Sequence, residues 1–382
     1  MQLYKLKELY SITSGLSKPA SQFGYGNPFL SFSIVFNNYH IPSSLIDLVN
    51  TSPLEIKRFS IKRGDVFVTR TSEKLDELGK SCVALQDYEK ATFNGFCKRL
   101  RPIVNESIIL PEYAQYLFRS KQFTNQIIYS CPMSTRASLN EEILNTIVLN
   151  IHSLSEQRHI VDIIGSLDNK IENNNKLLEK CYIFLNLNMK KLMIGKDKKI
   201  ISSFDDIEII SSGIDKFNSG KIYLDTSCVS DNSIVDISNK VTYTDRPSRA
   251  NMKPIKNSVW FAKLKSSPKH IIVKDYSNEI LDNCIFSTGF LGIKIDNVKF
   301  NLLSTYFTSD VFEKEKDSLS IGATMQSINN VTFKGMYIPD FSPTDYISFN
   351  NLSEPILKLI YKTELENIKL RKLKNIYLAK FF

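Results

Sequence analysis

The sequence predicts an α+β protein with an internal repeat, in which each of two mixed domains is followed by one long helix. Apolar residues recur at alternating steps of four and three through residues 160–192, which is the heptad pattern of a long helix. A weaker copy of this pattern, including Ile360 and Leu370, closes the chain. Segments upstream of both patterns also match. The repeat therefore includes the domains as well as the helices.

The matched upstream segments are persuasive because they are not periodic. At an offset of 189 residues, which takes Phe123 to Phe312, residues 116–123 lie over residues 305–312. In the same register, residues 135–140 lie over residues 324–329, and each segment continues into a stretch rich in β-formers. The repeat unit is therefore a mixed α/β domain followed by a long helix.

Changes of pattern along the chain define the domain boundaries. Turn-rich segments and short strands predict a first domain over residues 1–152, followed by a central long helix over 153–194. Gly195 and the charged residues after it stop that helix. The second domain is expected over residues 195–346 and a C-terminal long helix over 347–382, with Pro355 in its first turn.

The apolar stripes of the two long helices predict a helix–helix seam. Its predicted members are Ile160, Ile164, Leu167, Ile171, Asn174, Leu178, Leu185, Ile360, Asn367, Leu370 and Tyr377. Asparagine in such a stripe costs stability but fixes the register of paired helices. Asn174 is therefore a candidate for specifying the pairing, and the alternative is compositional drift in a chain rich in lysine and asparagine.

Three segments of the first repeat carry a family resemblance. The Ser-Thr-Arg-x-Ser-Leu-Asn segment at 134–140, the Leu-Ser-Glu-Gln-Arg segment at 154–158 and the helix opening at 166–172 together resemble the specificity subunit of Type I restriction–modification systems. The resemblance covers essentially the whole chain. In the second repeat no Glu-Gln-Arg follows Ser342, and Lys374 occupies a seam position.

The resemblance implies two tandem target-recognition domains, each reading one half of a bipartite DNA sequence. Two long antiparallel coiled-coil helices would separate them with pseudo-two-fold symmetry, set the spacing of the half-sites and dock the DNA methyltransferase (modification) subunits. It further implies that this chain binds no cofactor, because S-adenosylmethionine, ATP and Mg would be held by the methyltransferase subunits and by a restriction (motor) subunit.

Charge and composition agree with a nucleic-acid partner without requiring one. The formal net charge of +9 and the pI near 9.0 favour a polyanion such as double-stranded DNA, and the alternative is a basic surface that binds no nucleic acid. Six cysteines are scattered singly, which predicts small buried residues and no zinc site. Charges near the N-terminus and the lack of a long apolar run predict a cytoplasmic protein with no membrane segment.

Catalytic and metal-binding motifs are not found in the sequence. Asn27-Pro28-Phe29 lacks the second proline of an adenine methyltransferase loop, and Lys74 stands where a phosphate loop ending at Ser81 needs its first glycine. Asp168 opens a heptad helix, where capping or surface charge explains it better than a nuclease role. We therefore predict no catalytic residue and no metal ligand.

The candidate DNA contacts are basic and hydroxyl residues in loops at matching repeat positions. Arginine and lysine suit phosphates and guanine edges, and hydroxyls suit either. The candidates are Arg70, Thr71, Ser72, Lys80 and Arg136 in the first domain, and Arg246, Arg249, Lys263, Lys265, Lys269 and Gln326 in the second. Residues 246–249 have no counterpart in the first repeat.

The sequence therefore predicts a non-enzymatic DNA-recognition subunit. Two rival functions stay open at this stage. One is a coiled-coil adaptor that binds only protein, which footprinting of DNA would distinguish. The other is a stand-alone DNA methyltransferase or nuclease, which the missing motifs disfavour and labelled S-adenosylmethionine would test.

Overall fold

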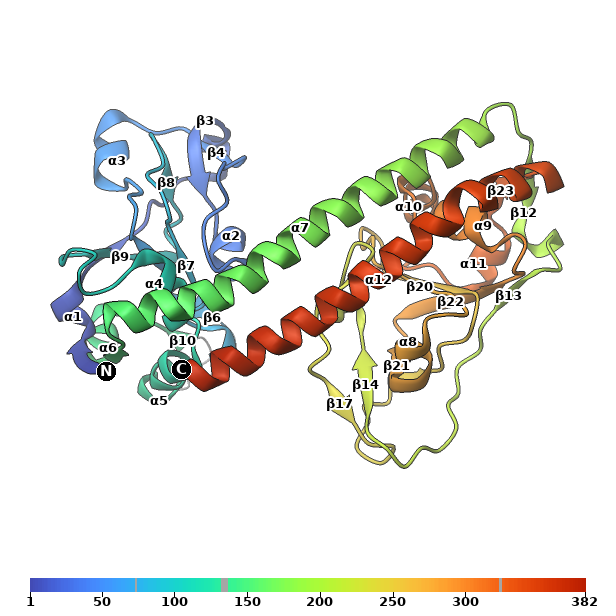
Figure 1. Ribbon diagram of the computed structural model, residues 1–382. Coiled ribbons are helices and arrows are strands. Elements are labelled where there is room, and N and C mark those ends of the chain that lie inside the picture. The colour runs from blue at the N-terminus through green and yellow to red at the C-terminus, as the bar shows by residue number, and fades with distance from the viewer. Residues whose placement is uncertain (73, 132–136, 323–324) are drawn as a thin grey trace. The chain divides into compact units, whose positions relative to one another are not determined.

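The computed structural model describes residues 1–72, 74–131, 137–322 and 325–382 (Figure 1). It divides into two compact units. Unit 1 comprises residues 1–169 and 373–382, and unit 2 comprises residues 170–372. The long helices α7 (Leu154–Met193) and α12 (Pro343–Phe381) each contribute residues to both units.

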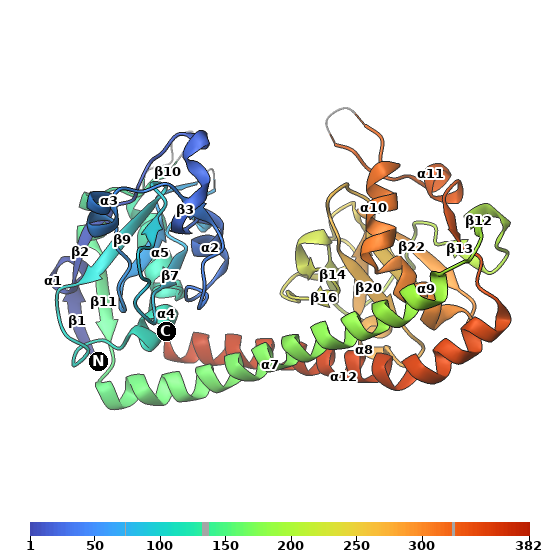
Figure 2. The same cartoon turned by 90° about the horizontal axis from the view of Figure 1, so that it is seen from above.

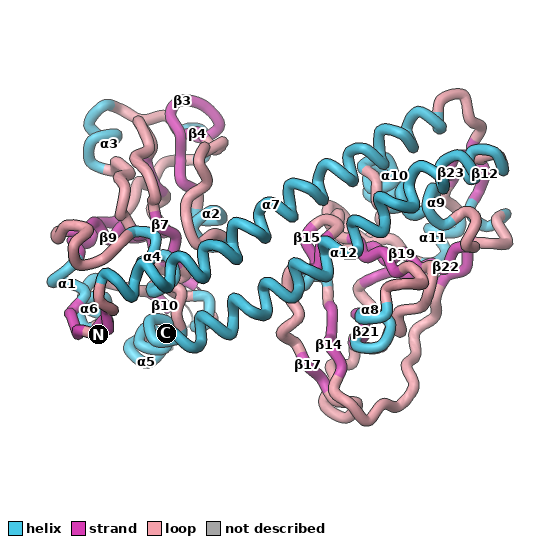
Figure 3. Tube along the Cα trace, viewed as in Figure 1, coloured by secondary structure: helices cyan, strands magenta, loops and turns pink. Residues whose placement is uncertain are grey.

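Unit 1 is a mixed α/β domain of short strands joined by long loops (Figure 3). Its main sheet has the strand order β2-β9-β5-β7, and β1 pairs separately with β11. The strands are β1 Gln2–Lys5, β2 Tyr10–Ser14, β3 Phe23–Leu30, β4 Leu48–Val49, β5 Val66–Thr69, β6 Thr71–Ser72, β7 Ser81–Val83, β8 Thr92–Phe93, β9 Cys97–Pro102, β10 Ala137–Ser138 and β11 Val148–Ile151. The short helices are α1 Leu6–Leu9, α2 Phe32–Asn37, α3 Pro53–Arg58, α4 Pro111–Leu117, α5 Lys121–Ser130 and α6 Glu141–Thr146.

Unit 2 repeats this arrangement. Its sheet β13-β22-β19-β20 corresponds strand by strand to the main sheet of unit 1, and the β12–β23 pair corresponds to β1–β11. The strands are β12 Lys198–Ile200, β13 Ile207–Ile209, β14 Lys221–Leu224, β15 Val229–Ser230, β16 Ser233–Ile234, β17 Lys240–Val241, β18 Ala250–Met252, β19 Ser258–Ala262, β20 His270–Val273, β21 Cys284–Ser287, β22 Phe290–Ile295 and β23 Tyr337–Pro339. The short helices are α8 Asn278–Asn283, α9 Phe300–Phe307, α10 Asp310–Ser318 and α11 Asn330–Lys334.

Helix caps explain why segments 189 residues apart match in the sequence. Ser120 caps α5 by accepting from the backbone N–H of Phe123, and Ser309 caps α10 by accepting from that of Phe312. Asn140 and Asn329 cap α6 and α11 in the same way. Cap side chains satisfy N–H groups that a helix leaves unpaired, so equivalent helices keep equivalent caps. The predicted internal repeat is confirmed.

The two long helices begin with equivalent caps as well. Ser153 and Glu156 form a capping box at α7, and Ser342 pairs with Asp345 at α12, where the Asp345 carboxylate accepts from the Ser342 N–H at 2.7 Å. The placement of Pro355 in the first turn was wrong, because this cap starts α12 at Pro343 and leaves Pro355 inside the helix.

The Glu-Gln-Arg motif also has a structural explanation in unit 1. The buried Gln157 side chain donates to the carbonyl of Ile108 at 2.7 Å and accepts from the N–H of Leu110 at 2.9 Å. At the same offset in unit 2 stands Tyr346, which is buried. The two repeats therefore fasten their long helices to the domain with different chemistry.

Each sheet packs against helices to form a core. In unit 2, α9 covers β19. Phe312 of α10 stacks edge-on against Phe261 with ring centroids 4.8 Å apart. The helices α9 and α10 are labelled in Figure 2. On the other face of β19, Trp260 lies over Gly292, where an added Cβ would come within 2.4 Å of the indole. The six cysteines are all buried, as predicted, and their thiols are free.

Among the helices that the structure describes, none combines the length and apolar character needed to cross a membrane. The described residues also contain no group of three or more histidine, cysteine, aspartate or glutamate side chains placed to hold a metal ion.

Candidate nucleic-acid interface

Arg70 is a junction of three segments in unit 1. It follows β5, and its N–H donates to the carbonyl of Phe96 at 2.9 Å while its own carbonyl accepts from the N–H of Leu139 at 2.7 Å. The guanidinium donates to the carbonyl of Gly95 at 3.4 Å. Arg70 therefore joins the end of β5 to the turn before β9 and to the segment that leads into α6.

Lys263 occupies the equivalent junction in unit 2. It follows β19, donates its N–H to the carbonyl of Gly289 at 3.0 Å and accepts from the N–H of Ile328 at 2.9 Å. Its ammonium donates to the carbonyl of Thr288 at 2.9 Å, and burial lowers the pKa of the Lys263 side chain. The predicted equivalence of the two loops is confirmed by these hydrogen bonds, whereas contact with DNA stays a prediction.

The far ends of the two loops match as well. The N–H of Thr69 donates to the carbonyl of Lys80 at 2.9 Å, and the N–H of Ala262 donates to that of Lys269 at 2.9 Å. The Lys269 ammonium also donates to the carbonyl of Thr226 at 2.6 Å. Residues 70–80 and 263–269 are therefore corresponding connections between paired antiparallel strands, β5–β7 and β19–β20.

The structure brings together candidate segments that are far apart in the sequence. In unit 1, Thr71 pairs with Ser138 and Ser72 with Ala137, through β6 and β10. In unit 2, the Lys265 N–H donates to the backbone carbonyl of Gln326 at 2.9 Å, and its ammonium donates to Oε1 of the Gln326 side chain at 2.7 Å. Each unit thus builds one cluster from two loops.

Two of the remaining candidates lie in different settings, and a third cannot be placed. Arg249 is exposed, and its carbonyl accepts from the N–H of Thr288 at 2.9 Å, so it adjoins the turn that Lys263 holds. The Arg246 guanidinium stacks on the Tyr243 ring at 4.0 Å and donates to that residue's carbonyl. Arg136 lies outside the described residues.

The sequence did not single out the exposed apolar side chains of these clusters. Phe96 is 60% exposed beside the Arg70 junction, and Met325 is 66% exposed beside Gln326. In the Lys263 junction Gly289 takes the place of Phe96, and the next residue, Phe290, is fully buried in β22. An exposed aromatic or thioether beside basic groups suits apolar contact with thymine methyl groups. A Gly-Phe pair occurs in the sequence at 95–96 and again at 289–290, but the pair alone does not distinguish an exposed phenylalanine from a buried one.

The residues predicted to form the helix seam are all buried or partly buried. Ile160, Ile164, Asn174, Leu178, Leu185, Ile360 and Asn367 are buried, and Leu167, Ile171, Leu370 and Tyr377 are partly buried. In unit 2, the Asn174 amide donates to Oδ1 of Asn367 at 2.9 Å. In unit 1, the ammonium of Lys374 lies 2.6 Å from the Asp168 carboxylate. Within unit 2, the Tyr182 hydroxyl also donates to the Glu364 carboxylate at 3.4 Å, so residue numbers increase along α7 as they decrease along α12 and the helices run antiparallel.

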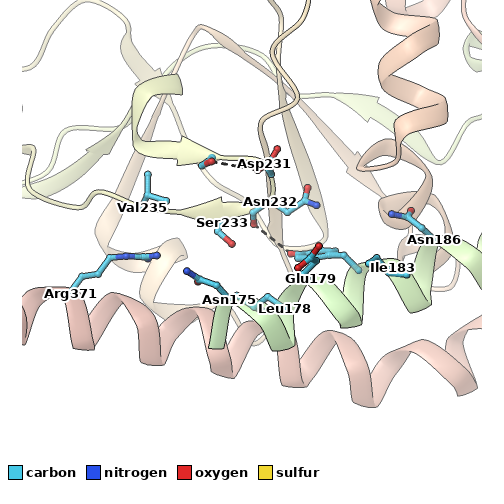
Figure 4. A pocket seen from close by; sticks show the side chains of 12 residues that line it. Asn175, Leu178, Glu179, Ile183, Asn186, Asp231, Asn232, Ser233, Val235 and Arg371 are labelled. Carbon is cyan, nitrogen blue, oxygen red and sulfur yellow. Dashed lines mark hydrogen bonds between the residues drawn. The ribbon is translucent and has the colours of Figure 1, made fainter. Parts of the chain in front are cut away.

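A cavity of about 500 Å³ lies in unit 2 between the long helices and the β15–β16 hairpin (Figure 4). Asn175, Glu179 and Arg371 line its helical side, and Asn232 and Ser233 line the hairpin. Next to it, burial raises the pKa of Glu364 to about 8, although a hydrogen bond from Tyr182 and the charge of Arg371 oppose the shift.

Comparison with known proteins places the fold. Residues 1–181 match the family model of the Type I restriction modification DNA specificity domain. No curated protein matches the chain in sequence. A crystal structure of the Type-I restriction-modification system S subunit from M. genitalium matches 100% of this chain and 96% of its own, with a TM-score of 0.53 and 11% identity.

Two further solved structures cover 99% of the chain at 14% identity. One, described as underlying complex assembly and conformational transition of the type I R-M system, has a TM-score of 0.39 over 96% of its own length. The other, the HsdS subunit from Thermoanaerobacter tengcongensis, has a TM-score of 0.36 over 95% of its length.

The resemblance predicted from the sequence is thereby confirmed. Residues 1–181 match the Type I restriction modification DNA specificity domain, and the chain as a whole has the fold of the M. genitalium S subunit.

Proposed function

We propose that the chain is the DNA sequence-recognition subunit of a Type I restriction–modification complex and that each unit reads one half of a bipartite site. The family of residues 1–181 supports DNA recognition in general. The observation that carries the two-reader proposal is the equivalence of Arg70 and Lys263, which occupy the same junction in two copies of one scaffold. We further propose that the chain acts on cytoplasmic DNA and is not itself an enzyme.

The long helices are the proposed docking surface for the methyltransferase subunits, which would carry S-adenosylmethionine. Beyond the seam, α7 exposes Leu177, Phe184 and Leu187 at 38%, 42% and 56%. Apolar side chains exposed along one helix favour a protein partner. The restriction subunit, with ATP and Mg, would join the same complex.

The test of the two-reader proposal is a methylation map. The chain, co-expressed with its methyltransferase subunits, carries Arg70→Gln or Lys263→Gln, and methylated adenines are located by single-molecule sequencing. Loss of a base contact relaxes one position by about 1–3 kcal/mol, whereas loss of a phosphate contact weakens all sequences alike. Lys62→Gln and Lys256→Gln are matched controls, because both are exposed and precede the same strands at their opposite ends.

We expect each test variant to alter only one half of the methylated motif, and the controls to alter neither. If both halves changed together in each single variant, the two-reader proposal would be wrong. Methyl transfer from labelled S-adenosylmethionine by the purified chain alone would contradict its assignment as a non-catalytic subunit.

The proposed role of the helices in setting half-site spacing has a separate test. A heptad of about 10 Å is inserted into α7 between Asp168 and Asn174, with a matching heptad into α12 between Asn367 and Lys374, so that both polar contacts keep their partners. Because B-DNA rises about 3.4 Å per base pair, the gap should grow by up to roughly three base pairs with unchanged half-sites. An unchanged gap would refute the spacer role.

A further inference from the structure

A buried polar chain underlies the recognition loop of unit 2. The imidazole of His270 lies 2.9 Å from Oδ1 of Asn232 through Nδ1 and 2.9 Å from the Glu313 carboxylate through Nε2. The other oxygen of Glu313 accepts from the Lys316 ammonium at 2.7 Å. The His270 and Lys316 side chains are 3% and 0% exposed. We call Asn232, His270, Glu313 and Lys316 the His270 network.

Lys316 connects this network to the loop backbone. Its ammonium donates to the carbonyls of Ala262 and Ser267, each at 3.2 Å, at the two ends of the segment that carries Lys263 and Lys265. On the outer side, the next residue of α10, Asp317, accepts from the N–H of Ser266 at 3.0 Å. Ser266 has φ of +55°, a conformation that needs such support in a residue other than glycine.

The scaffold does not require a lysine at this position. At the repeat offset in unit 1 stands Ile127, which is fully buried and packs against Gly79 at the end of the equivalent loop. Burying an ammonium is costly unless it is paired and hydrogen-bonded. Although burial acts to raise the pKa of Glu313, hydrogen bonds from His270 and Lys316 lower it overall, so the carboxylate is charged and compensates the lysine.

We propose that Lys316, held by Glu313 and His270, is a positioning residue that fixes the shape of residues 263–269 and thereby the half-site that unit 2 reads. This inference rests on the proposed function. The lysine satisfies two loop carbonyls at once, which an apolar side chain cannot do. Lys263, Lys265 and Lys269 are then presented from a preorganised loop, which reduces the entropy that DNA binding must overcome.

The test separates positioning from stability in the complex with methyltransferase subunits. Lys316→Met removes both loop contacts and leaves the buried Glu313 carboxylate without the ammonium that pairs with it. The double variant Glu313→Gln/Lys316→Met also removes the charge of that carboxylate. Asp317→Ala removes the outer support of Ser266 and leaves the buried network intact. Lys314→Met is the matched control, because that side chain is 83% exposed on the same helix.

Thermal unfolding and the methylation map are measured for each variant. We expect the double variant to recover most of the thermal stability that Lys316→Met loses, while the half-site of unit 2 stays relaxed by roughly 5- to 150-fold at one or more positions. Asp317→Ala should relax the same half-site, and the half-site of unit 1 and the Lys314→Met control should not change.

The inference is overturned if the folded double variant and Asp317→Ala both read the original half-site with undiminished discrimination. It is also overturned if specificity returns together with stability in the double variant, because the lysine would then serve only the core. Failure of the proposed function is distinguishable, since the wild-type complex itself would then methylate no bipartite site.

Discussion

Replacing Asn174 and Asn367, the polar pair between the long helices, should show separately what the pair contributes to stability and what it contributes to the register of the helices. The Asn174 amide donates to Asn367 at 2.9 Å and to Glu366 at 2.8 Å, and the Asn367 amide donates to Asn175 at 3.0 Å. Asn174 and Asn367 are 4% and 1% exposed. Asn367→Leu leaves polar groups of Asn174 short of a partner, which costs about 1–3 kcal/mol, toward the lower end because Glu366 still accepts.

The double variant Asn174→Leu/Asn367→Leu leaves neither member of the pair unsatisfied and adds two apolar side chains to the seam. We expect it to be at least as stable as the wild type, so that a double-mutant cycle gives a favourable leucine–leucine coupling of about 2 kcal/mol or more. Differential scanning fluorimetry of the assembled complex would measure this, at about 2–4 °C per kcal/mol for units of this size.

The register prediction uses the same double variant. A seam of leucines no longer distinguishes the native pairing from one shifted by a heptad, whereas a buried polar pair does. We therefore expect methylated sites with mixed half-site spacing in the double variant and uniform spacing in the wild type. Uniform native spacing in a stable double variant would refute the register role of Asn174.

Three further predictions concern other parts of the structure. Lys374→Met removes an ammonium 2.6 Å from Asp168. The free energy of local opening, measured by amide hydrogen exchange over residues 373–382, should therefore fall by about 1–3 kcal/mol; unchanged exchange would count against this contact. The folded-state pKa of Glu364, about 8, is above its unfolded value near 4.5, so its contribution to stability is complete below pH 4.5 and is lost as pH rises toward 8. Glu364→Gln should therefore flatten the decline in Tm between pH 5 and 8, and an unaltered slope would contradict the assignment. Gly292→Ala should destabilise unit 2 by about 1–3 kcal/mol, because its Cβ would meet the Trp260 ring at 2.4 Å; a wild-type Tm would show that the ring yields freely.

The sequence predicted those parts of the fold that local patterns specify. Heptad spacing requires only a period of apolar residues, so α7 was predicted to within a residue of its observed ends. Caps such as Asn140 and Asn329 act within three residues of themselves, and this is why the non-periodic matches between the repeats were informative. Arg70 and Lys263 lie 193 residues apart, so the equivalence of their loops followed from the same repeat with an adjustment of four residues.

Features that depend on contacts across the fold could not be predicted. From the sequence alone, Lys374 is a charged residue in an apolar stripe. The structure supplies its partners, because the centroid of the Tyr39 ring lies 4.0 Å from its ammonium and Asp168 faces it from α7. His270 had no neighbour in the sequence that suggested a network, because Glu313 is brought to it by α10. Pro355 was misplaced because the cap at Ser342, thirteen residues earlier, sets where α12 begins.

The two repeats share the backbone geometry of their loops but differ in the side chains that support them. Arg70 and Lys263 make the same two backbone hydrogen bonds, yet the loops they begin are supported by Ile127 in one unit and Lys316 in the other. An apolar contact between Ile127 and Gly79 constrains a single point, whereas an ammonium that bridges two carbonyls constrains both ends of a loop. The support beneath a loop can therefore change its shape without altering a residue that faces the ligand. On the proposed function, substitutions at position 316 and at position 127 are expected to be a route to new half-sites that leaves the sheet, the caps and the long helices intact.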